Sequence, residues 1–250
     1  MKLCRYMHAD SVGIGEMVGD EIWVLSPQME RTEELWYRDE VRLLAPAAPS
    51  KVVCVGRNYA DHAAELGNEV PKAPLLFLKA PSSIIADREP IIIPPQSERA
   101  EHEAELAVVI GKRAKDIRDD EDALSYVLGY TCLNDVTARD VQRADVQFTR
   151  GKSFDTFCPF GPYIETELDP TDIEVTCTVN GETRQHGRTS QMVFPVEFLV
   201  RYISRQMTLM PGDVIATGTP AGVSQLTHGD TCAITIQGIG TLTNPVVGDH

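Results

Sequence analysis

Short hydrophobic runs dominate the chain. Most are alternating or wholly apolar stretches bounded by Gly, Pro, Asn or Asp, and this pattern is typical of β-strands. Helical spacing of apolar residues is rarer. It is clearest after Pro195, where residues three and four apart form one buried stripe, namely Val196, Leu199, Val200 and Ile203. Because strands predominate and helices are inserted between groups of them, we predict an α+β, mostly β fold and no doubly wound parallel sheet.

The N-terminal part of the chain is predicted to be a small β domain. Its strand patterns lie at residues 2–7, 12–18 and 21–25. Residues 32–44 carry a weak helical pattern. The proline-punctuated segment 45–50 cannot continue a helix and is typical of a linker. We therefore place a small N-terminal β domain at 1–48 and a catalytic domain at 49–250.

The second part continues the mixture of short strands and few helices. Strands are expected at 51–56, 75–79, 84–85, 91–93, 102–112, 130–133, 173–179, 213–216, 231–236 and 239–243. Helices are expected at 57–67, from Asp119 to Leu128, at 137–142 and after Pro195. Asn180-Gly181 predicts a tight hairpin turn after the strand at 173–179.

One strand carries an unusual pair of acids. Glu103 and Glu105 stand at alternate positions and lead into a buried apolar block. Residues i and i+2 of a strand share a face, so the two carboxylates would lie side by side and repel. A hard divalent cation with oxygen ligands would relieve that repulsion. The alternative, and the commoner one for this short pattern alone, is an exposed strand end with solvated acids.

Other polar residues suggest chemistry, each with a plainer alternative. His62 and Glu65 are three apart on an expected helix, which suits a general base held by a carboxylate and equally a surface ion pair. Asp135 follows a strand, where a residue can bind metal or cap a helix. Lys152 lies in a Gly/Pro-rich loop, where solvation is the ordinary outcome. The glycines of 217–222 allow close approach of a ligand or simply form a turn.

Charge and composition exclude several classes of function. Lys and Arg number 23 against 37 Asp and Glu, a net charge of -14, which disfavours nucleic acids and anionic membranes as partners. The six cysteines form no C-x-x-C pair, so a structural zinc site is not expected. With no signal peptide and no long apolar run, we expect a cytoplasmic protein. The dinucleotide, Walker and G-x-S-x-G motifs are absent from the sequence.

Five blocks in order resemble the fumarylacetoacetate hydrolase family. They are GRNYADH at 56–62, HEAEL with VIGK at 102–112, NDVTARDVQ at 134–142, GKSF at 151–154 and GDVIATGTP at 212–220. The short leading segment is similar to the single-catalytic-domain branch, which includes acylpyruvases and 2-hydroxyhepta-2,4-diene-1,7-dioate isomerases. The resemblance implies a mixed β-sandwich roll, assembled as a homodimer.

The resemblance also implies a set of site residues. The family's metal ligands fall on Glu103, Glu105 and Asp135, for Mg²⁺ or for Mn²⁺ or Ca²⁺ in its place. Its catalytic residues fall on His62, Glu65 and Lys152, and its substrate-binding positions on Arg139, Gln142, Gly218 and Thr219. Glu101 alternates with the two glutamates but lies outside the family's metal site.

The implied function is metal-dependent C–C bond hydrolysis in a small 2-oxo or 1,3-diketo acid of the acylpyruvate or fumarylacetoacetate type. Isomerisation or decarboxylation of a 2-hydroxy-dienoate diacid or an oxaloacetate-like acid, as in aromatic catabolism, is the alternative. The presence of His62 and Glu65 favours hydrolysis. An inactive binding domain and a set of merely solvated acids are further alternatives. We expect the His62 helix to act as a lid that orders when substrate binds.

Overall fold

The computed structural model describes residues 1–248 and is built mainly from strands. Strands account for 43% of the chain and helices for 15%, which confirms the prediction of a mostly β, α+β fold. The strands are β1 (Lys2–His8), β2 (Ser11–Val18), β3 (Glu21–Leu25), β4 (Arg31–Tyr37), β5 (Arg42–Leu44), β6 (Val52–Gly56), β7 (Leu75–Lys79), β8 (Ile84–Ile85), β9 (Ile91–Ile92), β10 (Ala100–Glu101), β11 (Ala104–Ile110), β12 (Val127–Asn134), β13 (Thr137–Ala138), β14 (Cys158–Glu165), β15 (Glu174–Val179), β16 (Glu182–Arg188), β17 (Val214–Ala216), β18 (Thr231–Ile236) and β19 (Gly240–Val247).

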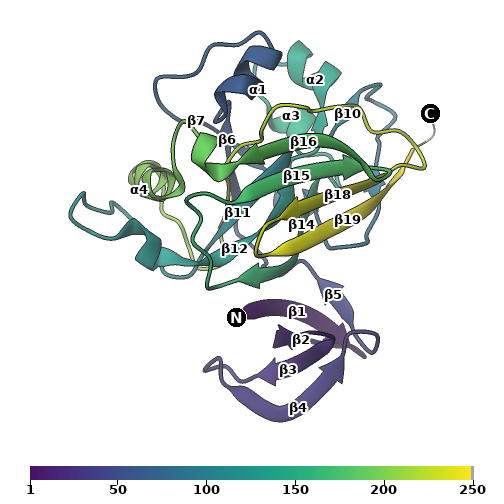
Figure 1. The fold of residues 1–250 in the computed structure, drawn as a ribbon, viewed down its shortest axis with the longest axis vertical. Coiled ribbons are helices and arrows are strands. Elements are labelled where there is room, and N and C mark those ends of the chain that lie inside the picture. Colours follow the sequence, from purple (N-terminus) through teal and green to yellow (C-terminus); the bar gives the residue numbers. More distant parts are fainter. Residues whose placement is uncertain (249–250) are drawn as a thin grey trace.

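These strands form one large sheet, a smaller sheet and a short ladder. The large sheet runs β4-β3-β2-β1-β14-β12-β11-β17-β6-β7, with β5 beside β1 and β8 beside β14. The smaller sheet runs β16-β15-β18-β19-β9, and β10 pairs with β13. Most pairings are antiparallel, whereas β17 runs parallel to β6. The N-terminal strands lie at the opposite end of the molecule from the short helices (Figure 1).

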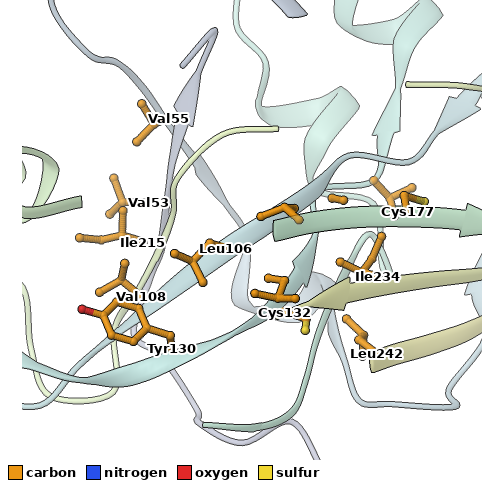
Figure 2. Close-up of a cluster of buried hydrophobic side chains, with 14 of the residues drawn as sticks. Val53, Val55, Leu106, Val108, Tyr130, Cys132, Cys177, Ile215, Ile234 and Leu242 are labelled. Carbon is orange, nitrogen blue, oxygen red and sulfur yellow. The ribbon is translucent and has the colours of Figure 1, made fainter. Parts of the chain in front are cut away.

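The main hydrophobic core lies between the large sheet and the smaller sheet. Leu106 and Val108 of β11 and Ile234 of β18, in the facing sheet, belong to one cluster of buried side chains (Figure 2). The alternate residues of β11, Ala107 and Val109, are buried in a second cluster on the other face. The central strands are therefore covered on both faces, which explains why the predicted strand at 102–112 is so uniformly apolar.

Among the described residues, four α-helices complete the fold, namely α1 (Ala60–Glu65), α2 (Arg139–Ala144), α3 (Thr149–Lys152) and α4 (Val196–Gln206). The first three are short and gather at one end of the molecule, whereas α4 packs at its side (Figure 1). The predicted stripe of α4 is buried, which confirms that helix. Within residues 1–248, no helix combines the length and apolar character needed to cross a membrane.

Two sequence-based predictions of helices were wrong. Residues 32–44 form strands β4 and β5, because β4 pairs along β3 and β5 along β1. The helix expected to begin at Asp119 is a short 3₁₀ turn, Ala123–Tyr126, and the side chain of Asp122 caps it by accepting from Leu124 N at 2.9 Å. Pairing of Val127 onward with β11 starts β12 where the helix was expected to continue.

The N-terminal strands extend the large sheet, since Lys2 of β1 pairs with Glu165 of β14. The linker that follows is fixed at Asp213, whose carboxylate accepts hydrogen bonds from the backbone N–H groups of Ser50 and Lys51 at 3.0 and 3.2 Å. The domain boundary between residues 48 and 49 stays a prediction.

Candidate active site

Three buried carboxylates meet where β11 begins and β12 ends. Ala104 pairs with Asn134 across the two strands, so the residues just outside the ladder, Glu103 and Asp135, also face each other. Asp135 N donates to Glu103 O at 2.9 Å. Carboxylate oxygens of Glu103, Glu105 and Asp135, the acidic triad, all lie within 4.8 Å of one another. The two ends of an antiparallel pair thus bring together residues some thirty positions apart.

Two neighbours fix the backbone and the side chains of the acidic triad. Asn134 Oδ1 accepts from Glu103 N at 3.0 Å. Gly218, which follows β17, donates its N–H to Glu105 Oε2 at 2.7 Å. Gly218 has φ +101°, and a Cβ there would lie 2.7 Å from Asn58 Cβ. Only glycine lets the backbone approach Glu105 in this way.

Buried cations neutralise two members of the acidic triad. Lys152 Nζ lies 2.7 Å from both Glu103 Oε2 and Asp135 Oδ2. Lys79 Nζ lies 2.6 Å from Asp135 Oδ1, and Arg139 bonds to Glu103 Oε1. Every oxygen of Glu103 and Asp135 therefore has a cationic partner.

Glu105 is the exception. Its carboxylate receives the Gly218 N–H, and its Oε1 has no hydrogen-bond partner within residues 1–248. Burial, together with the charges of Asp135 and Glu103, raises the pKa of Glu105 well above its usual range. The pKa of Glu103 is lowered instead, because Lys152 and Arg139 outweigh the effect of its burial. Without a further cation, burial and the two neighbouring carboxylates favour the neutral form of Glu105.

The donor set fits a hard divalent cation. It consists of carboxylate oxygens alone, and Glu105 is the carboxylate that lacks a positive partner. A carboxylate oxygen can accept more than one donor, so the ion pairs of Lys152 do not use up the binding capacity of Glu103 and Asp135. A metal site at the acidic triad therefore agrees with both the chemistry and the charge balance.

The predicted His–Glu pair lies on α1 beside the same cavity. His62 Nδ1 is 3.4 Å from Glu65 Oε2, with the histidine buried and the Glu65 side chain one-third exposed. Both oxygens of Glu65 lie near Gly222 N, at 3.1 and 3.2 Å. The loop after β17 thus holds the carboxylate that orients the histidine, which leaves Nε2 as the free ring nitrogen.

A cavity of about 260 Å³ connects these groups. Its lining includes the acidic triad, His62, Lys152, Arg139, Gln142 and Thr219. Phe77 and Phe148 form an apolar wall, with ring centroids 5.6 Å apart in an edge-on arrangement. The ammonium of Lys152 lies 5.0 Å from the Phe77 centroid. The cavity therefore has a charged end and an apolar side.

The predicted substrate-binding residues are in place, and several of their polar groups already have partners. Arg139 bonds to Glu101 as well as Glu103, and its Nη1 donates to Gln142 Oε1 at 2.7 Å. The Thr219 hydroxyl donates to Ala104 O at 2.8 Å and accepts from Gln185. Gly218 contacts Glu105 through its backbone N–H and presents no side chain to a ligand. The structure brings all the predicted site residues together, and their individual roles stay predictions.

Sequence reasoning missed Lys79, which ends β7. A lysine at the end of an apolar strand ordinarily extends its ammonium to solvent. This one is buried, because Asp135 and Val136 O accept from it at 2.6 and 3.0 Å. Its partner, Asp135, follows a different strand, so no local pattern in the sequence indicates the ion pair.

Known proteins include clear relatives of this chain. The family model described as "Fumarylacetoacetate (FAA) hydrolase C-terminal" matches residues 51–247. The chain belongs to the fumarylacetoacetate hydrolase family. A second model, "Rv2993c-like, N-terminal", matches residues 1–46. The resemblance seen in the sequence is confirmed, and members of this family are enzymes that generally bind a divalent metal.

Three relatives illustrate the range of the family. Protein Rv2993c of Mycobacterium tuberculosis is 52% identical over 86% of this chain and 82% of its own. Human mitochondrial oxaloacetate tautomerase FAHD2A is 46% identical over 84% of this chain and 71% of its own. The crystal structure of 2-hydroxyhepta-2,4-diene-1,7-dioate isomerase from Mycobacterium marinum superposes with a TM-score of 0.92 at 44% identity, covering 100% and 99% of the two chains.

Proposed function

We propose that this chain is a divalent-metal-dependent enzyme that forms the enol or enolate of a small 2-oxo acid. One observation carries the proposal: a buried carboxylate without a cation, Glu105, faces the same cavity as a histidine held by a carboxylate. Mg²⁺ is the proposed metal, with Mn²⁺ or Ca²⁺ as substitutes. A homodimer in the cytoplasm is likewise proposed on the family resemblance.

The metal would be held by the acidic triad and would supply Lewis acidity and a fixed position for a chelating 2-oxo acid. The chain's own residues move the proton. His62, oriented through Nδ1 by Glu65, would remove a proton from the carbon next to the oxo group through Nε2. The C–H electron pair becomes the enolate double bond, and negative charge develops on the former oxo oxygen.

Lys152 would stabilise that charge. Its ammonium is buried and pre-placed, and Asp135 and Glu103 raise its pKa against the opposing effect of burial, which keeps it cationic. Removing a stabiliser of this kind from an active site typically lowers the rate about 10²–10³-fold. Phe77 and Phe148 would exclude water from one side of the enolate. The proton then returns from His62 to oxygen or to a more distant carbon.

Two outcomes of this chemistry are candidates. Tautomerisation or isomerisation needs only the proton transfer just described. The human relative is named a tautomerase and the M. marinum relative an isomerase. C–C hydrolysis, the first expectation from the sequence, would instead have His62 take a proton from a water that attacks the distant carbonyl, so that C–C cleavage leaves the enolate, and the family's name supports it. Proton transfer is common to both.

Mg²⁺ titration by calorimetry tests the metal site. We expect the unaltered protein to bind one Mg²⁺ and Glu105→Gln to bind it at least about 100-fold more weakly, because even outer contacts of a metal site are worth 10–100-fold. Gln is close to Glu in size and carries no charge, so the variant should fold normally. Glu98→Gln, at an exposed acid, is the control and should bind as the unaltered protein does.

Assays with and without chelator then separate the outcomes. Oxaloacetate would report tautomerisation by the change in enol absorbance, and an acylpyruvate would report hydrolysis by release of pyruvate. His62→Gln should abolish whichever activity is found while retaining Mg²⁺ binding. Equal Mg²⁺ heats for Glu105→Gln and the unaltered protein, or no metal-dependent change in either substrate, would overturn the proposal.

A further inference from the structure

Gln185 joins the smaller sheet to the large sheet and to the loop 217–222. It lies on β16, at the end of the smaller sheet, and is fully buried. Its Oε1 accepts from Ala104 N, at the start of β11, at 3.0 Å. Its Nε2 donates to Pro220 O, in the loop, at 2.7 Å. One side chain therefore connects three segments that lie far apart in the sequence.

The hydrogen bonds of Gln185 fix the orientation of its amide group. Ala104 N can only donate and Pro220 O can only accept, so Oε1 faces the strand and Nε2 faces the loop. His102 Nδ1 therefore donates to Oε1, at 2.9 Å, and Thr219 Oγ1 accepts from Nε2, at 2.7 Å. Both lone pairs of the oxygen and both hydrogens of the nitrogen are thus used. A side chain that lacks either half of the amide would leave buried polar groups unpaired.

The loop 217–222 packs directly against the backbone of β16. A Cβ added at Gly187 would lie 2.6 Å from Pro220 Cβ. A Cβ added at Gly222, which has φ +102°, would lie 2.1 Å from Arg184 O. Glycine at both positions permits this close approach. The loop is thus seated on β16 and tied to it by the buried amide.

This loop carries two backbone donors of the candidate active site. Gly218 N donates to Glu105 Oε2 at 2.7 Å, and Gly222 N lies 3.1 and 3.2 Å from the two oxygens of Glu65. Glu65 in turn lies beside His62 Nδ1, at 3.4 Å. The loop therefore positions a proposed metal ligand and the partner of the proposed base. Both donors lie within two residues of a contact with the amide on β16.

We propose that Gln185 is a positioning residue of the active site. By holding the loop 217–222 against β11, it keeps the N–H groups of Gly218 and Gly222 aligned with the carboxylates that accept them. Its consequence for Mg²⁺ binding rests on the proposed function. Glu105 has no cationic partner in the described part of the chain, so the Gly218 N–H is what orients its carboxylate. A loosened loop therefore weakens metal binding without removing any ligand.

Mg²⁺ titration and hydrogen exchange of Gln185→Met test this role. We expect the variant to bind Mg²⁺ about 10–100-fold more weakly than the unaltered protein, since contacts that orient metal ligands have that effect. Without Mg²⁺, the amides of Gly218 and Gly222 should exchange at least about tenfold faster in the variant, because the loop opens more often. A purely structural role would lower the free energy of unfolding and leave both quantities unchanged in the folded protein.

Asn244→Leu is the matched control. Asn244 is a buried amide on β19 of the same sheet, and its Nδ2 donates to Ala86 O at 2.9 Å and to Glu89 O at 2.8 Å. The variant should lose stability in urea denaturation, since it also leaves buried carbonyls unpaired. Its Mg²⁺ affinity and the exchange of the two loop amides should equal those of the unaltered protein.

Thr219→Val is a milder change that tests the same contact if Gln185→Met does not fold. It removes the hydroxyl that accepts from Gln185 and donates to Ala104 O, while the bond to Pro220 O remains. We expect weaker Mg²⁺ binding and faster exchange in the loop, and Thr219→Ser, which keeps the hydroxyl, should behave as the unaltered protein does. No substrate is present, so a contact between Thr219 and substrate does not enter the result.

The possible results separate this role from the proposed function. If Gln185→Met and Thr219→Val match Asn244→Leu in both Mg²⁺ affinity and loop exchange, the positioning role is overturned. If Thr219→Ser is as impaired as Thr219→Val, the hydroxyl contact is not the cause and the role is likewise overturned. If the unaltered protein binds no Mg²⁺, the proposed function is overturned, and exchange at Gly218 and Gly222 still decides whether Gln185 holds the loop.

Discussion

Lys79 Nζ lies 2.6 Å from Asp135 Oδ1, and neither side chain has any exposed surface. The lysine also donates to Val136 O at 3.0 Å, so it holds both the carboxylate and the backbone that follows it. Lys152 occupies the other oxygen of Asp135. Asp135 is thereby fixed from two sides, and the geometry of the acidic triad depends on a residue outside it.

Replacing Lys79 by Met should destabilise the protein strongly. Removal of one partner from a buried ion pair leaves a poorly compensated charge and typically costs about 3–5 kcal/mol. We expect a loss of this size in the free energy of unfolding, measured by urea denaturation without metal. Lys115→Met, which removes an exposed pair with Asp116, should change it by less than ~1 kcal/mol. A loss for Lys79→Met as small as that of the control would contradict the role assigned to the pair.

Gly218→Ala should damage both stability and metal binding. The new Cβ would lie 2.7 Å from Asn58 Cβ and 3.2 Å from Val55 O, which displaces the N–H that Glu105 accepts. Gly212→Ala is the matched control, because Gly212 has φ +86° with nothing within 4 Å of an added Cβ. Both variants share the backbone cost of roughly 1 kcal/mol. Thermal unfolding should show a larger loss for Gly218→Ala, and calorimetry should show weaker Mg²⁺ binding for that variant only.

The stability contributed by Asp213 should depend on pH. Burial is the largest single influence on its pKa and raises it, but Lys51, Met210 N–H and Ser50 together lower the pKa below the usual 3.8. A lowered pKa in the folded state stabilises the protein above about pH 3.8, and this is lost as pH falls through the lowered value. Asp213→Asn should therefore cost about 1–3 kcal/mol at pH 7 and progressively less at pH 3 and below, by urea denaturation. An equal cost at both pH values would contradict the ionic role.

The sequence predicted the elements whose signals are local. The apolar block after Glu105 predicted a buried strand, and the stripe beginning at Val196 predicted a buried helix face; the structure confirms both. The helix predicted at residues 32–44 was wrong because its apolar pattern was weak. These residues instead form strands that pair with β3 and β1. The acids after Asp119 suggested the first turn of a helix. The helix cannot continue past Tyr126, because the residues from Val127 onward pair with β11 as strand β12.

The sequence identified the residues of the site, but it could not show which of the carboxylates would be paired with buried cations. The motifs around Glu103 and Asp135 located the acidic triad, and β-pairing explains how they meet. Nothing local showed that Lys79 would be buried against Asp135, or that Glu105 would lack a cation. Both depend on contacts between distant strands. Arg57 was quoted within a motif, yet only the structure shows that it lines the same cavity as the acidic triad.

The helix α1 should become protected from hydrogen exchange when ligand binds. It has six residues and no side-chain cap, and isolated helices of this length are unstable. Its anchors include the buried Ala63 and the weak contacts between Glu65 and Gly222 N. With Mg²⁺ and oxalate present, we expect the amides of Ala63 and Leu66 to exchange at least about tenfold more slowly than with Mg²⁺ alone, while those of α4 stay unchanged. If α1 without oxalate were already protected as strongly as α4, the lid would be excluded, because a segment that never opens cannot admit substrate past His62.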